Sequence, residues 1–180
     1  MVKPAILILD CTPKTEPSEG RLLKEFFEIC RLYKPAKARP RYRQITSKKQ
    51  FLQKLDTNRR WDIIHIAAHG DNISGETFIG NRNTWKASAA EIKEAGHRRT
   101  GRQATLVFVN ACLTSRRDMD GAFNSKYFLA PKKEVEWIDA ALFAITFYKK
   151  YIIDGKDMRP AWKFARKHTK TGSIYPEYWY

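Results

Sequence analysis

Four short, largely apolar runs stand out in the hydrophobic pattern of the chain, and each is followed by polar residues or a turn signal. They cover residues 5–9, 63–67, 106–109 and 127–130. Continuous apolar runs of this length are typical of strands that are covered on both faces, as the strands of a parallel sheet are. A fifth segment, 41–45, alternates polar residues with Tyr and Ile, which predicts a more exposed strand.

Segments with helical spacing of apolar residues separate these runs. Two of them open on capping boxes, Ser47 with Gln50 and Ser88 with Glu91, and Gly96 is expected to end the second. Strands alternating with helices predict a mostly parallel central sheet with helices on both faces, a three-layer α/β sandwich. The expected helices are 22–33, 47–55, 88–95, 138–152 and 158–168.

Composition places the chain among globular proteins. Its 180 residues, 43% of them hydrophobic and 29% charged, suit a single domain, residues 1–180, with a sizeable core. No apolar run approaches the roughly 18 residues that a membrane span needs, so we expect no membrane partner. Cys11, Cys30 and Cys112 are few and odd in number, which argues against a disulfide framework and for a cytoplasmic location.

The chain is strongly basic. Its 34 Lys and Arg residues against 19 Asp and Glu residues give a net charge of +15. Such a charge suits nucleic acid, an anionic surface or an acidic partner protein. It equally suits a solvated surface, because the basic clusters at 34–43 and 163–170 lack the interleaved aromatic residues of a base-stacking platform. Both interpretations stay open.

Three reactive side chains come directly after the predicted strands. They are Asp10, His69 and Cys112. Because the carboxyl ends of parallel strands line one crevice, neighbouring strands would bring these side chains together. A thiolate beside an imidazole is a nucleophile with a general acid at hand. The backbone N–H groups of Gly70 and Cys112 would supply an oxyanion hole.

The sequence gives weaker support for other reactive or ligand-binding sites. A single buried cysteine is more often a small hydrophobe than a nucleophile, and Cys11 and Cys30 fit that interpretation. His65 lies inside its strand, where a hydrogen-bonded structural histidine is expected. No Cys-x-x-Cys or His-Glu-x-x-His spacing occurs and no glycine-rich phosphate loop follows the first strand, so we expect neither a metal nor a cofactor.

The segments HIAAHGD, ending at Asp71, and NAC, ending at Cys112, resemble the motifs of caspase-like cysteine peptidases. The caspase version of the second motif is Gln-Ala-Cys, with its histidine about 50 residues upstream. With the extra His65, the pattern is most similar to the CHAT branch of that group, which is often found in bacteria. The resemblance spans nearly the whole chain, although the segment 112–127 is shorter and more charged than in that family.

The resemblance implies a caspase-like three-layer domain and a cysteine endopeptidase. His69 and Cys112 would form its catalytic dyad, a protein or peptide would be its substrate, and a partner protein would regulate it. The alternative is a catalytically idle interaction module whose basic surface binds nucleic acid or an acidic partner.

The most detailed expectation concerns the substrate residue before the cut. In the family, the residue before the cut enters a pocket near the loop after the first strand, so Asp10 would favour Arg or Lys there. Two alternatives stay open. Asp10 would instead cap the loop 12–20 or pair with a lysine, and Arg116 and Arg117 would reverse the preference toward acidic substrates.

Overall fold

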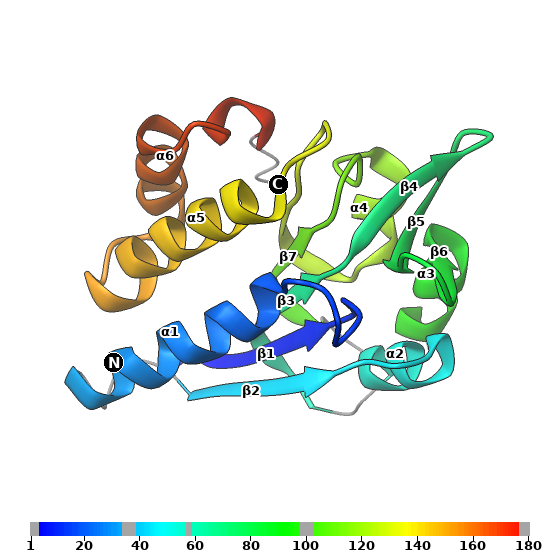
Figure 1. The fold of residues 1–180 in the computed structure, drawn as a ribbon, viewed down its shortest axis with the longest axis horizontal. Helices are drawn as coiled ribbons and strands as arrows, with labels where there is room; N and C mark the ends of the chain where they lie inside the picture. The colour runs from blue at the N-terminus through cyan, green and yellow to red at the C-terminus, as the bar shows by residue number, and fades with distance from the viewer. Residues whose placement is uncertain (1–3, 34–38, 57–58, 98–102, 177–180) are drawn as a thin grey trace.

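A parallel sheet of five strands forms the centre of the fold (Figure 1). The computed structural model describes residues 4–33, 39–56, 59–97 and 103–176. The strand order is β2–β1–β3–β7–β8, and each neighbouring pair is parallel. The predicted α/β class and parallel sheet are therefore confirmed. The strands are β1 (Ala5–Asp10), β2 (Arg39–Gln44), β3 (Trp61–Ala67), β7 (Ala104–Asn110) and β8 (Ser125–Leu129).

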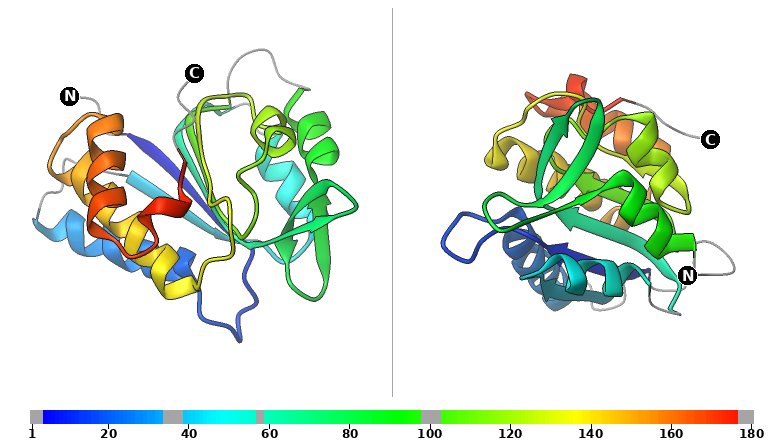
Figure 2. Two further views of the ribbon diagram at one scale, coloured as in Figure 1. Left: turned by 90° about the horizontal axis from the view of Figure 1, so that it is seen from above. Right: turned by 90° about the vertical axis from the view of Figure 1, so that its right-hand side faces the viewer.

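Helices cover both faces of this sheet, as Figure 2 shows from above. One face carries α1 (Glu19–Tyr33), α5 (Trp137–Tyr148) and α6 (Met158–His168). The other carries α2 (Lys48–Leu55), α3 (Ala89–His97) and α4 (Arg117–Ala122).

The alternation of side chains along each strand explains the two cores between these layers. Ile6 and Ile8 point to the α1 and α5 side, whereas Leu7 and Leu9 point to the α2 and α3 side. Because both faces are covered, residues 5–9 of β1 are all apolar, and this is why the sequence shows an unbroken run there.

Several helix ends follow local signals in the sequence. The Ser88 hydroxyl accepts from the Glu91 backbone N–H at 3.3 Å, and Glu91 accepts from the Ser88 N–H at 2.9 Å. This reciprocal pair is the predicted capping box. Ser47 likewise caps α2 by accepting from Gln50 at 3.2 Å. Gly96 lies inside α3 and does not end it, because the helix continues to His97.

The last predicted helices also form, with two differences. The helix expected over 138–152 is α5 followed by a π-helical turn, Lys149–Ile153. Asp157 occupies the N-cap position of α6 but makes no side-chain capping hydrogen bond there. A final short 3₁₀ turn, Gly172–Ile174, brings the chain back against α5.

A second sheet, which the hydrophobic pattern did not predict, follows β3 directly. It is antiparallel and contains β4 (His69–Ile73), β5 (Glu76–Asn81) and β6 (Trp85–Ser88). Ser74 and Gly75 make the first hairpin turn with φ angles of 51° and 89°, as a two-residue turn of this kind requires. His69 therefore lies where the chain passes from one sheet to the other.

No helix in the described part of the chain is both long enough and apolar enough to cross a membrane.

Candidate active site

His69 and Cys112 lie at the carboxyl ends of two adjacent strands. β3 and β7 pair in a register that sets Ala67 opposite Asn110, and each of the two side chains follows its strand end closely. Both residues line the same two cavities, with volumes of about 510 Å³ and about 260 Å³. The structure thus brings together the histidine and the cysteine that the sequence pattern singled out.

Gly70 packs directly on the backbone of Cys112. A Cβ atom at position 70 would overlap the Cys112 carbonyl oxygen and lie 2.8 Å from the Cys112 nitrogen. Such an approach leaves room for no side chain. The glycine after His69 is therefore required by this contact, which holds the start of β4 against the residue that carries the thiol.

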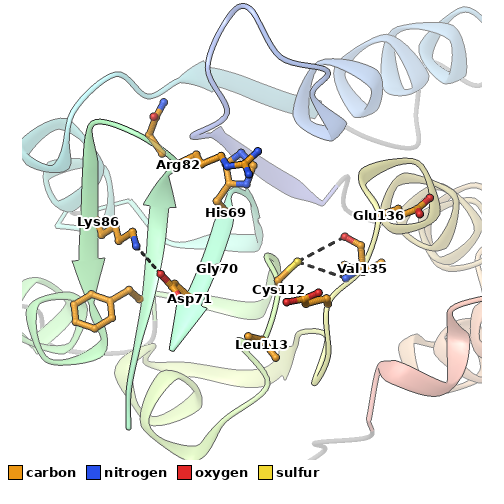
Figure 3. Close-up of a pocket in the computed structure, with 12 residues that line it drawn as sticks. His69, Gly70, Asp71, Arg82, Lys86, Cys112, Leu113, Val135 and Glu136 are labelled. Atoms are coloured by element: carbon orange, nitrogen blue, oxygen red, sulfur yellow. Dashed lines mark hydrogen bonds and ion pairs between the residues drawn. The ribbon is translucent and has the colours of Figure 1, made fainter. Parts of the chain in front are cut away.

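The Cys112 thiol is half-buried and contacts the loop between β8 and α5. Its sulfur accepts from the Val135 N–H at 3.4 Å and lies 3.6 Å from the Val135 carbonyl oxygen. Figure 3 shows the side chain pointing toward Val135. Among the described residues, no hydrogen bond joins this sulfur to the His69 ring. In structures without substrate, a candidate base often lies beyond hydrogen-bonding distance of its partner, because such bonds tighten when substrate binds.

The His69 ring has a carboxylate partner that the sequence did not reveal. Its Nε2 lies 3.0 Å from a carboxylate oxygen of Glu16, in the loop between β1 and α1. In the neutral imidazole this contact places the proton on Nε2 and leaves Nδ1 as the acceptor. The contact with Glu16 therefore fixes the orientation of the His69 ring.

Asp10 takes a different position from the one that a substrate-binding role requires. It is fully buried and accepts hydrogen bonds from the Thr12 N–H at 3.0 Å, the Tyr42 hydroxyl at 2.8 Å and the Ser18 hydroxyl. Burial and the hydrogen bond to Asp10 raise the pKa of Tyr42. Asp10 lines neither cavity. It anchors the loop 12–20, which matches the alternative interpretation of this residue.

Arg116 and Arg117, the other residues considered for substrate preference, also lie outside the two cavities. Arg116 occupies the N-cap position of α4, and its Nε lies 4.0 Å from an Asp118 oxygen.

His65 is a structural histidine, as expected. It is fully buried, its Nδ1 lies 2.9 Å from the Tyr148 hydroxyl, and its Nε2 lies 3.2 Å from a Glu19 oxygen. The same Glu19 oxygen accepts from the Asn110 side chain at 2.6 Å. This buried polar network joins β3 and β7 just below the ends that carry His69 and Cys112.

The two cavities differ in their charged residues. In the larger one, Lys86 pairs with Asp71 at 2.5 Å, and this hydrogen bond lowers the pKa of Asp71. The smaller one contains the carboxylates of Glu16 and Glu19, and Trp137 also lines it. Arg82 lines both cavities.

The described residues contain no group of three or more His, Cys, Asp or Glu side chains that could hold a metal ion. Cys11, Cys30 and Cys112 are all free thiols. No protein-family model matches the chain, and no curated protein matches it either.

Proposed function

We propose that the protein is a cytoplasmic cysteine endopeptidase of the caspase-like type. The observation that carries this proposal is the convergence of His69 and Cys112, from the ends of two adjacent strands, on the same two cavities. The order of the motifs, a His-Gly strand end before an Ala-Cys strand end, supports a caspase-like arrangement of this α/β fold.

The reaction follows from the groups present. His69 takes the proton of the Cys112 thiol, and the resulting thiolate attacks the carbonyl carbon of the scissile bond and forms a tetrahedral intermediate. His69 then gives a proton to the leaving amine, and a thioester to Cys112 remains. Water, deprotonated by His69, attacks the thioester and releases the acid with the thiol regenerated. Glu16 orients the imidazole throughout.

The oxyanion of the tetrahedral intermediate would accept from the backbone N–H groups of Gly70 and Cys112. Support comes from the contact between these two backbone segments, which lie too close for a Cβ atom to fit between them. A hole formed by backbone groups in fixed contact needs no rearrangement during the reaction.

A preference for Arg or Lys before the cut is carried by Glu16 and Glu19, not by Asp10. Both residues line the smaller cavity beside Cys112, and Trp137 in the same lining could accept a cation on its ring. A lysine or arginine side chain placed there would meet the negative charge of Glu16 and Glu19, which the positive charge of Arg82 offsets in part.

A cleavage screen with peptides varied at the residue before the cut tests this function. The parent should cleave, with Arg or Lys preferred, and Cys112→Ala and His69→Ala should each lower kcat/KM by at least about 10³-fold, as the loss of a dyad member does. Glu16→Gln should retain more activity than either.

A thiol-reactive peptide probe separates the peptidase from the idle interaction module. In a peptidase, the probe labels Cys112 of the parent much faster than Cys112 of His69→Ala. Equal labelling of the two proteins, or full cleavage by Cys112→Ala, would remove the peptidase proposal.

A further inference from the structure

The turn that carries Cys112 is strained. Leu113, the next residue, has a φ of 59°, in the left-handed region that a branched side chain rarely adopts. Such a conformation persists only where the surrounding structure holds it. We define residues 111–115 as the Cys112 turn. The contacts that hold this turn also hold the thiol, so they decide where the proposed nucleophile lies.

The loop 131–136, between β8 and α5, holds one side of the Cys112 turn. The backbone N–H groups of Leu113 and Ser115 donate to the carbonyl oxygens of Lys133 and Pro131, at 3.4 Å and 3.0 Å. Val135 of the same loop contacts the Cys112 sulfur through its N–H and carbonyl groups. The loop therefore fixes both the backbone of the turn and its side chain.

The C-terminal segment 172–175 in turn holds this loop. The Lys132 N–H donates to the Ile174 carbonyl oxygen at 2.9 Å. Tyr175, directly after it, is fully buried, and its ring stacks on Phe143 with centroids 3.8 Å apart. The segment is thus packed into the core beside the site.

The Tyr175 hydroxyl reaches the other side of the Cys112 turn. It donates to the Asn110 side-chain oxygen at 2.6 Å, and the Asn110 amide donates to Glu19 at 2.6 Å and to the Ala140 carbonyl oxygen at 3.1 Å. Asn110 is the last residue of β7 and comes just before the turn. Burial raises the pKa of Tyr175 well above its usual value, so the hydroxyl keeps its proton for this bond.

We propose that Tyr175 is a positioning residue for Cys112. It holds the end of β7 through Asn110, and its segment holds the loop 131–136 that contacts the thiol. This role rests on the proposed peptidase function. It makes the C-terminal segment a part of the active site, although its residues do not line either cavity.

Tyr175→Phe tests this role, with Tyr148→Phe as the matched control. Each substitution removes one hydroxyl from a fully buried tyrosine. The Tyr175 hydroxyl bonds directly to Asn110, whereas the Tyr148 hydroxyl reaches it only through His65 and Glu19. Both variants should keep the parent's circular dichroism spectrum and lose a comparable amount of Tm. Only Tyr175→Phe should lower kcat, by about tenfold at unchanged KM, because misplacing a reacting group costs rate and not binding.

Alkylation of Cys112 by iodoacetamide, located by peptide mass spectrometry, supplies a readout that needs no cleavage. Tyr175→Phe should be alkylated several-fold faster than the parent, because a loosened turn releases the sulfur from Val135. The Leu113 amide should also exchange faster with deuterium in this variant than in Tyr148→Phe.

The two levels of the proposal fail separately. A parent that cleaves no peptide refutes the peptidase function, and alkylation and exchange then decide on the role of Tyr175 in holding the turn. Equal alkylation of Cys112 in the parent and Tyr175→Phe overturns that role, as does an equal loss of kcat in Tyr175→Phe and Tyr148→Phe.

Discussion

At the scale of single residues, Gly70 shows how one position without a side chain sets the spacing between two others. The backbone of position 70 touches that of Cys112, so the distance from His69 to the thiol depends on a contact in which neither side chain takes part. A change at Gly70 would therefore alter the site without removing a reactive group.

Gly70→Ala should lower both stability and activity. The added methyl group would overlap the Cys112 carbonyl oxygen, so the two backbones must separate, at a cost of about 1–3 kcal/mol typical of overpacking. Thermal unfolding and kcat/KM measure the two effects. Gly121→Ala, in α4, is the control: a Cβ atom there meets nothing within 4 Å, so the unfolding free energy should stay the same or rise. A Gly70→Ala variant with the parent's Tm would contradict the contact.

Single residues also show which parts of the candidate site the sequence can predict. His69 and Cys112 were found because each follows an apolar strand and because strand ends in a parallel sheet converge. Glu16 was missed because it lies in a loop whose path no periodicity describes, and its contact with His69 spans 53 positions. Asp10 follows an apolar run as His69 does, but the loop after it turns back, so Ser18 and Thr12 donate hydrogen bonds to its carboxylate.

At the scale of elements, the parallel strands could be predicted and the antiparallel sheet could not. Strands that are buried on both faces appear in the sequence as continuous apolar runs. β4, with the sequence HGDNI, has no buried residue, and its stability comes from pairing with β5. β4 and β5 pair locally across the turn at Ser74 and Gly75, but the polar sequence of β4 shows no hydrophobic pattern, so only the structure places the second sheet beside Cys112.

Asp118 ties two elements of the site together, and its role should depend on pH. It accepts from the Thr77 N–H at 2.9 Å and the Thr77 hydroxyl at 3.0 Å, which joins α4 to β5. Burial alone would raise the pKa of Asp118, but the hydrogen bonds from Thr77, together with those from the Met119 and Asp118 backbone, lower it. A carboxyl whose pKa is lowered on folding stabilises the fold above its unfolded pKa, and this stabilisation is lost as the pH falls through the lowered folded value.

Asp118→Asn should therefore destabilise the protein at neutral pH and cost less in acid. The expected loss of unfolding free energy is about 1 kcal/mol, because the carboxylate is about one-third exposed. Urea unfolding of parent and variant at pH 7 and at pH 3 measures the difference. A gap between the two proteins that is as large at pH 3 as at pH 7 would contradict the assignment.

At the scale of the whole molecule, the net charge of +15 is the feature that the proposed chemistry does not use. If this charge binds nucleic acid, the affinity should fall steeply between about 50 mM and 200 mM salt, by about 10³-fold or more for six or more phosphate contacts, because binding releases counterions. Fluorescence anisotropy with a labelled duplex measures this at several salt concentrations. Affinity that is weak and independent of salt would assign the charge to a solvated surface.

The chain passes from the parallel sheet to the hairpin at Ala68, so the two reactive groups belong to different sheets. The thiol follows β7 of the parallel sheet, whereas the imidazole belongs to His69, the first residue of β4 in the hairpin. The hairpin is linked to the rest of the fold by Ala68, by the close contact at Gly70 and by the hydrogen bonds between Thr77 and Asp118. A substitution in the hairpin, away from His69, would therefore alter the position of the imidazole. One in the loop 131–136 would alter the position of the sulfur through Val135.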